Sequence, residues 1–145
     1  TDIQAALIIS QLDKLSLFQK RRKEIVEKYN EAFSKIPEIT VQEEIPESDT
    51  TRHLYILRIK PEMLTIDRKQ FFAAMAAENI CCNVHYIPVY RHPYYEELGY
   101  KKGLCPKAEK LYEEIMSLPL YYSLTDEDVD DVIHAVTKIV ENYRK

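Results

Sequence analysis

Glycine is nearly absent from this sequence, because only Gly99 and Gly103 occur among its 145 residues. Loops that hold a phosphate or a dinucleotide with backbone N–H groups usually need a glycine-rich turn, where the chain can approach the ligand closely. No glycine precedes residue 99. The sequence therefore excludes a Walker loop and a Rossmann fingerprint.

Cysteine is also scarce. The three cysteines are odd in number, and two of them, Cys81 and Cys82, are adjacent, with Cys105 as the third. A disulfide framework normally uses an even number of spaced cysteines in an oxidising compartment. We therefore expect free thiols and a cytoplasmic location.

Long apolar runs and an excess of positive charge are missing as well. No apolar run approaches the roughly 20 residues that a membrane helix needs, and no basic-then-apolar signal segment opens the chain. The formal net charge of −4 argues against a nucleic-acid module, which normally presents a basic face. We expect neither a membrane nor a nucleic acid as partner.

Residues 1–36 have the apolar periodicity of helix, in two parts. The first part is apolar nearly all round, with Ala5, Leu7, Ile8 and Ile9 close together, so it needs cover on more than one side. A lone domain of this length offers little such cover. We expect the first turns to pack against something outside these residues, as if the sequence began inside a larger protein.

The remaining residues, 37–145, predict a sheet-and-helix layer. Strands are expected at 39–42, 53–59 and 80–86, an extended run at 117–120, and helices at 67–79, 106–116 and 125–143. Asp67 and Thr125 each begin a capping box, and Pro106 suits a first helical position. The predicted fold class is α/β: one small domain with a short, mostly antiparallel sheet and helices packed on one face.

An aromatic and polar stretch, from Val84 to Tyr95, is the most distinctive part of the chain. It contains two of the four histidines, and eight of the eleven tyrosines lie between Tyr86 and Tyr122. Imidazole and phenol groups combine an apolar body with a hydrogen-bonding tip, which suits the wall of a polar pocket. The alternative is that these rings pack, half-buried, around a proline-stiffened turn.

A metal site and a thiol site are both disfavoured here. On a strand, Cys82 and His85 point to opposite faces, while Cys81 and His85 share a face but lie roughly 13 Å apart. Zinc bonds near 2 Å cannot span that separation. A cysteine-dependent enzyme remains a hypothesis, which predicts loss of an activity when Cys82 is alkylated.

Several motifs, in order along the chain, resemble one known family. They are Thr1–Leu7 (TDIQAAL), Gln11-Leu12, Arg21-Arg22, Val84–Val89 (VHYIPV), His92–Tyr95 (HPYY), Pro106 with Ala108-Glu109, Ser117–Leu120 (SLPL) and Thr125–Val129 (TDEDV). Together they resemble the C-terminal small domain of the DegT/StrS-type nucleotide-sugar aminotransferases over essentially the whole chain. Within the family, the resemblance is nearest to enzymes that aminate C4 of a UDP-linked 4-keto-6-deoxy sugar.

The resemblance implies a fold type I transaminase that uses pyridoxal 5′-phosphate (PLP), with glutamate as amino donor and a homodimer as the active form. Such enzymes serve the synthesis of cell-surface polysaccharide or glycan precursors. Their cofactor lysine and the aspartate that pairs with the pyridine nitrogen belong to a large domain whose motifs are absent from these residues. We therefore expect no catalytic, cofactor-binding or metal-binding residue in this chain, and no transaminase activity from it alone.

The resemblance also implies which residues contact the substrate. His85 and Tyr86 are the best candidates for contacts with the nucleotide sugar, with Tyr90 and His92 behind them. The sequence departs from the family at Ile8, where glycine is common, and at Tyr90, where histidine is frequent. A second hypothesis treats the chain as a stand-alone binding domain that docks a partner through its apolar first helix.

Overall fold

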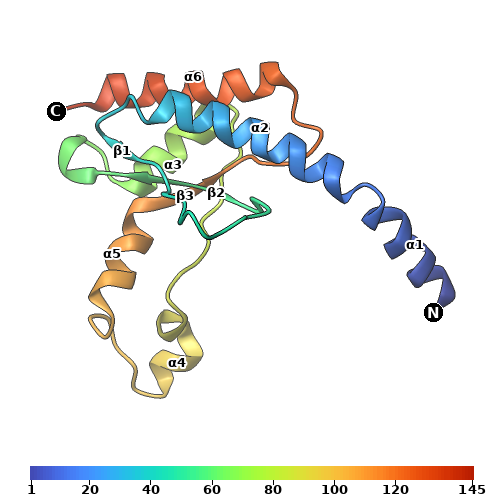
Figure 1. Ribbon diagram of the computed structural model, residues 1–145. Coiled ribbons are helices and arrows are strands. Elements are labelled where there is room, and N and C mark those ends of the chain that lie inside the picture. Colours follow the sequence, from blue (N-terminus) through green and yellow to red (C-terminus); the bar gives the residue numbers. More distant parts are fainter.

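The computed structural model describes all residues from 1 to 145 and shows a small sheet covered by long helices (Figure 1). The sheet has three antiparallel strands in the order β1 (Ile39–Thr40), β2 (Tyr55–Ile59) and β3 (Ile115–Leu118). The predicted fold class, a short antiparallel sheet with packed helices, is confirmed.

The predicted two-part N-terminal helix is confirmed as α1 (Asp2–Leu12) and α2 (Leu15–Phe33). Helices α2 and α6 (Asp126–Tyr143) pack against one another, and α3 (Arg68–Ala77) packs against α6 and β3 (Figure 1). The short α4 (Pro93–Glu97) and α5 (Pro106–Glu114) hang below the sheet as a separate projection. Two 3-10 turns complete the chain, η1 (Pro61–Met63) and η2 (Val89–Arg91).

One face of the sheet forms the core. Alternate residues of β2, namely Tyr55, Leu57 and Ile59, are buried, because successive side chains of a strand point to opposite faces. The rings of Tyr29 and Phe33 from α2 join Tyr55 in an aromatic cluster, with centroids 4.9 to 6.2 Å apart. The helices thus bury their apolar stripes on this face.

The predicted helix starts at Asp67 and Thr125 are confirmed as capping boxes. In the second, Asp128 accepts hydrogen bonds from the hydroxyl of Thr125 at 2.6 Å and its N–H at 2.8 Å. These bonds lower the pKa of Asp128 below its ordinary value. Asp128 therefore satisfies the amide of Thr125, and the acids in the first turn of α6 complement the helix dipole.

The predicted strand at 80–86 is wrong. Only Asn83 pairs with the sheet, through two backbone hydrogen bonds to Ser117 of 2.7 and 3.1 Å. Strand β3 is four residues long and runs directly into Pro119, which has no N–H to donate, so it offers a neighbour few partners. Residues 81–84 still alternate between exposed and half-buried, as extended chain does.

The predicted apolar face of the helix at 106–116 is also wrong. Helix α5 ends at Glu114, and Ile115 with Met116 belongs to β3 instead. The residues that α5 buries are Glu109 and Glu114, whose carboxylates find partners in this chain, whereas Leu111 is exposed. Polar pairing rather than apolar burial holds α5 in place.

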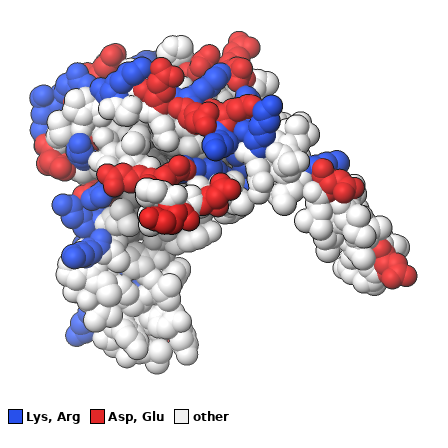
Figure 2. Space-filling view, in the orientation of Figure 1, with Lys and Arg blue, Asp and Glu red and all other residues white.

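Helix α1 extends away from the body and buries none of its residues (Figure 1). Its large apolar side chains are all exposed: Ile3, Leu7, Ile8, Ile9 and Leu12. Figure 2 shows charged side chains gathered over the helical body, while the projection of α4 and α5 is mostly uncharged in this view. None of the helices combines the length and the apolar character that crossing a bilayer requires.

An ion pair fastens the C-terminal end of the chain to the start of β1. The buried carboxylate of Glu38 accepts hydrogen bonds from Nε and Nη2 of Arg144 at 2.5 and 3.0 Å. These bonds hold the pKa of Glu38 below its ordinary value of 4.5. Since the folded state holds the lower pKa, the pair stabilises the fold above that ordinary value and loses its effect as pH falls through the folded pKa.

Replacing Glu38 by glutamine is expected to lower the Tm at about pH 7 by roughly 3–5 °C, because the charge-assisted bonds to Arg144 are lost. The variant should also lose less stability than the wild type as the pH is lowered from about 5 to about 3. Thermal unfolding at a series of pH values checks both effects. Parallel stability curves for the two proteins would contradict the role given to this pair.

Candidate functional site

The second face of the sheet lies opposite the helical core. Register places Ile56 beside Ser117 and Arg58 beside Ile115 on this face, because directly paired residues of antiparallel strands share a side. A cavity of about 620 Å³ opens here. It is lined by Thr40, Val41, Gln42, Glu43, Ile56, Arg58, His85, Leu111 and Ile115.

His85 reaches this cavity from the extended segment that follows α3. Its Nδ1 lies 2.8 Å from the hydroxyl oxygen of Ser117, a buried residue of β3. The pairing of Asn83 with Ser117 places His85, two residues later, over the same face. The bond fixes the ring, and Nε2, which has no partner within the chain, can bind a ligand.

The cation of Arg58 is engaged inside the chain. Its Nε and Nη2 atoms each lie 2.7 Å from Oε2 of Glu114, the last residue of α5, whose side chain is buried. The carboxylate thus neutralises the guanidinium of Arg58, which lines the cavity. The cavity therefore presents the uncharged hydrogen-bonding groups of Thr40, Gln42 and His85 together with the carboxylate of Glu43, and such groups can bond hydroxyls of a sugar.

The four residues expected to contact substrate do not gather in one cavity. Only His85 lines the 620 Å³ cavity. Tyr86 is 74% exposed, and its ring meets the His85 ring edge-on at 4.6 Å. Tyr90 lies in η2, where its hydroxyl is bonded to Glu109 of α5. His92 is exposed and precedes α4, where its carbonyl accepts the first hydrogen bonds of that helix.

Sequence reasoning missed Ser117, Arg58, Glu114 and Glu109. The alternation of β2 was a usable signal for Arg58, because it sits between two buried apolar positions of the strand. No pattern in the sequence indicated which residues would pair with Glu109 and Glu114. Each pair joins residues far apart in the chain, and their contact depends on how α5 meets the sheet.

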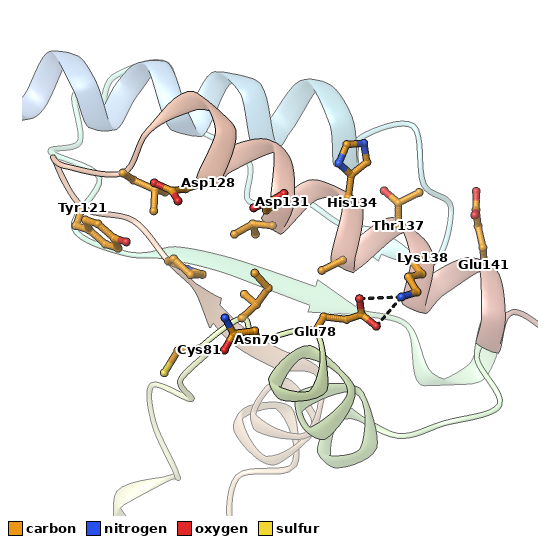
Figure 3. A pocket seen from close by; sticks show the side chains of 15 residues that line it. Glu78, Asn79, Cys81, Tyr121, Asp128, Asp131, His134, Thr137, Lys138 and Glu141 are labelled. Atoms are coloured by element: carbon orange, nitrogen blue, oxygen red, sulfur yellow. Dashed lines mark hydrogen bonds and ion pairs between the residues drawn. The ribbon is translucent and has the colours of Figure 1, made fainter.

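A larger cavity, of about 910 Å³, lies between α6 and residues 78–81 (Figure 3). It contains none of the residues expected to contact substrate. Figure 3 shows the carboxylate of Glu78 turned toward Lys138, whose Nζ lies 2.8 Å from both of its oxygens. Asp128, at the other end, is engaged by Thr125. Glu78, Lys138 and Asp128 are thus engaged within the chain, whereas the carboxylates of Asp131 and Glu141 in the same lining have no ion-pair partner.

A thiol or metal centre finds no support in the structure. Burial raises the pKa of the Cys82 thiol to about 12, which leaves almost no thiolate near neutral pH. No three side chains of histidine, cysteine, aspartate or glutamate come close enough to hold a metal ion. The cysteine-dependent hypothesis is therefore disfavoured.

The residues of this chain do not fit a PLP site. A lysine within reach of the substrate is needed to hold that cofactor, and no lysine lines the cavity beside His85. Lys138 lines the larger cavity, but Glu78 holds its ammonium group. A cofactor that acts at His85 would have to be bound by residues outside this chain.

Comparison with known proteins decides the family. A sequence model of the DegT/DnrJ/EryC1/StrS aminotransferase family matches residues 1–137. The chain belongs to this family. The resemblance stated from the sequence motifs is thereby confirmed, and the small sheet and its helices are those of a domain found in DegT/DnrJ/EryC1/StrS aminotransferases.

Two relatives illustrate the match in sequence. The spore coat polysaccharide biosynthesis protein SpsC of Bacillus subtilis is 42% identical over 142 residues, covering 97% of this chain and 36% of SpsC. A Helicobacter pylori UDP-4-amino-4,6-dideoxy-N-acetyl-β-L-altrosamine transaminase is 28% identical over 143 residues, covering 99% of this chain and 38% of that protein.

Spr1654 of Streptococcus pneumoniae supplies the structural comparison. Its PMP form superimposes with a TM-score of 0.89 at 34% identity, covering 98% of this chain and 35% of Spr1654. The same protein is also known in a PLP form. This chain therefore spans little more than a third of the length of the relatives it matches.

Proposed function

We propose that this chain is the C-terminal small-domain part of a PLP-dependent aminotransferase. The enzyme transfers an amino group from glutamate to a nucleotide-linked keto-deoxy sugar, in the cytoplasm, for cell-surface polysaccharide or glycan precursors. The observation that carries this proposal is the family match over residues 1–137, joined to the cavity at His85. The names of SpsC and of the Helicobacter pylori transaminase support the polysaccharide role and the UDP-linked sugar.

The work of the enzyme is then divided between two regions. The cofactor, bound outside this chain, supplies the electron sink for amino transfer. This chain supplies one wall of the sugar-nucleotide pocket, where Nε2 of His85 and the hydroxyl of Tyr86 would bond sugar hydroxyls or a diphosphate. The Ser117 contact of His85 and the exposure of Tyr86 support these roles. Tyr90 and His92 would lie behind His85 and Tyr86, on the loop that carries all four residues.

The exposed apolar surfaces support a larger assembly. We infer that residues 1–36 carry the link to the rest of the enzyme and that 37–145 form the small domain. Helix α1 and the projection of α4 and α5 would bury their uncharged faces against the remainder of a homodimer, since contiguous exposed apolar surface marks an interaction site. The same exposed α1 favours a second candidate, a stand-alone domain that docks an unrelated partner.

The deciding experiment uses the intact protein in which this chain occurs. Glutamate should shift the absorbance of bound PLP between 300 and 450 nm, and a UDP-linked 4-keto-6-deoxy sugar should reverse that shift as it is aminated. The 145-residue chain alone should show neither change. If the intact protein shows no pyridoxal absorbance band, or if no nucleotide keto sugar changes that band, the result would favour the second candidate, a stand-alone domain that docks a partner.

A further inference from the structure

The projection that carries η2, α4 and α5 has almost no apolar core of its own. Its only aromatic packing within the projection joins Tyr95 to Tyr94 and Tyr100, and no apolar residue between 86 and 114 is buried. Seven of its large side chains are exposed: Tyr86, Val89, Tyr94, Leu98, Tyr100, Leu104 and Leu111. Apolar burial is the usual force that holds a loop against a helix, and it is weak here. Something else must fix the descending limb, residues 86–97, against the ascending limb, residues 101–114.

One tyrosine makes that connection. The hydroxyl of Tyr90 donates to Oε1 of Glu109 at 2.5 Å and accepts from the N–H of Cys105 at 3.2 Å. The same Oε1 atom accepts from the N–H of Gly103 at 2.6 Å. Tyr90 makes all the hydrogen bonds that join the two limbs.

The environment of Glu109 strengthens the connection. Glu109 is only 8% exposed, although it is charged, and the cations of Arg91 and Lys102 favour its ionised form. A hydrogen bond to an ionised carboxylate is about twice as strong as a neutral one. Bonds from Tyr90 and Gly103 also lower the pKa of Glu109, so it stays ionised near neutral pH. The hydrogen-bond donors of the Glu109 carboxylate, Tyr90 and Gly103, therefore both come from the projection.

We propose that Tyr90 is a positioning residue that, through Glu109, fixes the loop carrying His85, Tyr86 and His92 in the geometry that binds the nucleotide sugar. This inference rests on the proposed function for the identity of the ligand. It gives Tyr90 an indirect role, because its hydroxyl already has a donor and an acceptor partner inside the chain. A phosphate oxygen, which can only accept, would have to displace Glu109 to bond this hydroxyl.

Hydrogen exchange in the intact protein tests the positioning role without any substrate. Tyr90→Phe removes the acceptor of the Cys105 amide, so faster exchange at Cys105 alone would be a local effect. The proposal expects at least about tenfold faster exchange also at Gly103, through Glu109, and at Arg91 and His92 in the turn of η2. Tyr94→Phe, an exposed tyrosine without a hydroxyl partner, is the matched control and should change none of them.

Glu109→Ala, in the other limb, should also increase the hydrogen-exchange rates of these amides. The double variant should exchange no faster than the single variant with the faster exchange, because the two residues act as one unit. Additive effects, or a change confined to Cys105, would overturn the proposal.

A kinetic measurement then tests whether the loop binds the nucleotide sugar. Tyr90→Phe should raise the KM for the nucleotide sugar about fivefold or more and leave the glutamate half-reaction unchanged. Faster exchange with an unchanged KM would overturn the substrate role of the loop and leave the positioning role standing.

Discussion

Replacing His85 by alanine in the intact protein is expected to lower kcat/KM for the nucleotide sugar by about 10- to 100-fold. The imidazole lines the cavity and is held by Ser117 at 2.8 Å through Nδ1, which leaves Nε2 without a partner in the chain. Its loss leaves a ligand group without a partner, which costs about 1.4 to 3 kcal/mol, and 1.4 kcal/mol corresponds to a factor of ten. The half-reaction with glutamate should proceed at the wild-type rate, because the proposed function assigns His85 to the sugar.

His134→Ala is the matched control for this prediction. His134 is an exposed histidine of α6 that lines the 910 Å³ cavity and not the cavity beside His85. It should leave kcat/KM unchanged. If His134→Ala impaired the enzyme and His85→Ala did not, the larger cavity would be the functional one. Steady-state kinetics with the nucleotide sugar varied at saturating glutamate separates the two results.

Replacing Phe71 by alanine is expected to lower the free energy of unfolding by about 3–5 kcal/mol. Phe71 is fully buried in the core cluster, where α3 packs against α6 and β3. Truncation removes apolar contacts and leaves a cavity that the surrounding helices fill only in part. Since a domain of this size has a total stability of about 5–15 kcal/mol, this variant approaches the point of unfolding.

Phe72→Ala provides the comparison within the same helix. Phe72 follows Phe71 directly, but a step of one residue turns it away from the core and leaves it half-buried. Its truncation should cost about 1 kcal/mol. Urea unfolding of the 145-residue chain, followed by circular dichroism, measures both. Equal losses for the two variants would show that α3 is seated differently on the sheet.

The local elements were largely determined by the sequence. Periodicity predicted α1, α2, α3 and α6, and the capping pairs at Asp67 and Thr125 fixed where two of them begin. These signals succeed because the side chains that satisfy a helix start lie within one turn of it. The same locality explains why β2 was predicted within two residues, from a short run rich in aromatic and branched side chains.

The site itself was only partly accessible to sequence reasoning. The aromatic stretch and its resemblance to the family pointed to His85, which the structure places in a cavity; its contact with substrate stays a prediction, as do those of Tyr86, Tyr90 and His92. The pattern suggested a strand there, yet pairing needs a partner strand of sufficient length. Strand β3 ends at Leu118, and only Asn83 finds a partner.

Tertiary structure decided everything that depends on partners distant in the chain. The periodicity of residues 106–116 gave an apolar helix face, but the fold buries Glu109 and Glu114 because Tyr90 and Arg58 meet them across 19 and 56 residues of sequence. Hydrophobic periodicity in a sequence indicates only which types of side chain are buried on average. Only the assembled sheet and projection determine which carboxylate has a donor within hydrogen-bonding distance, and a buried charge is tolerated only where it has one.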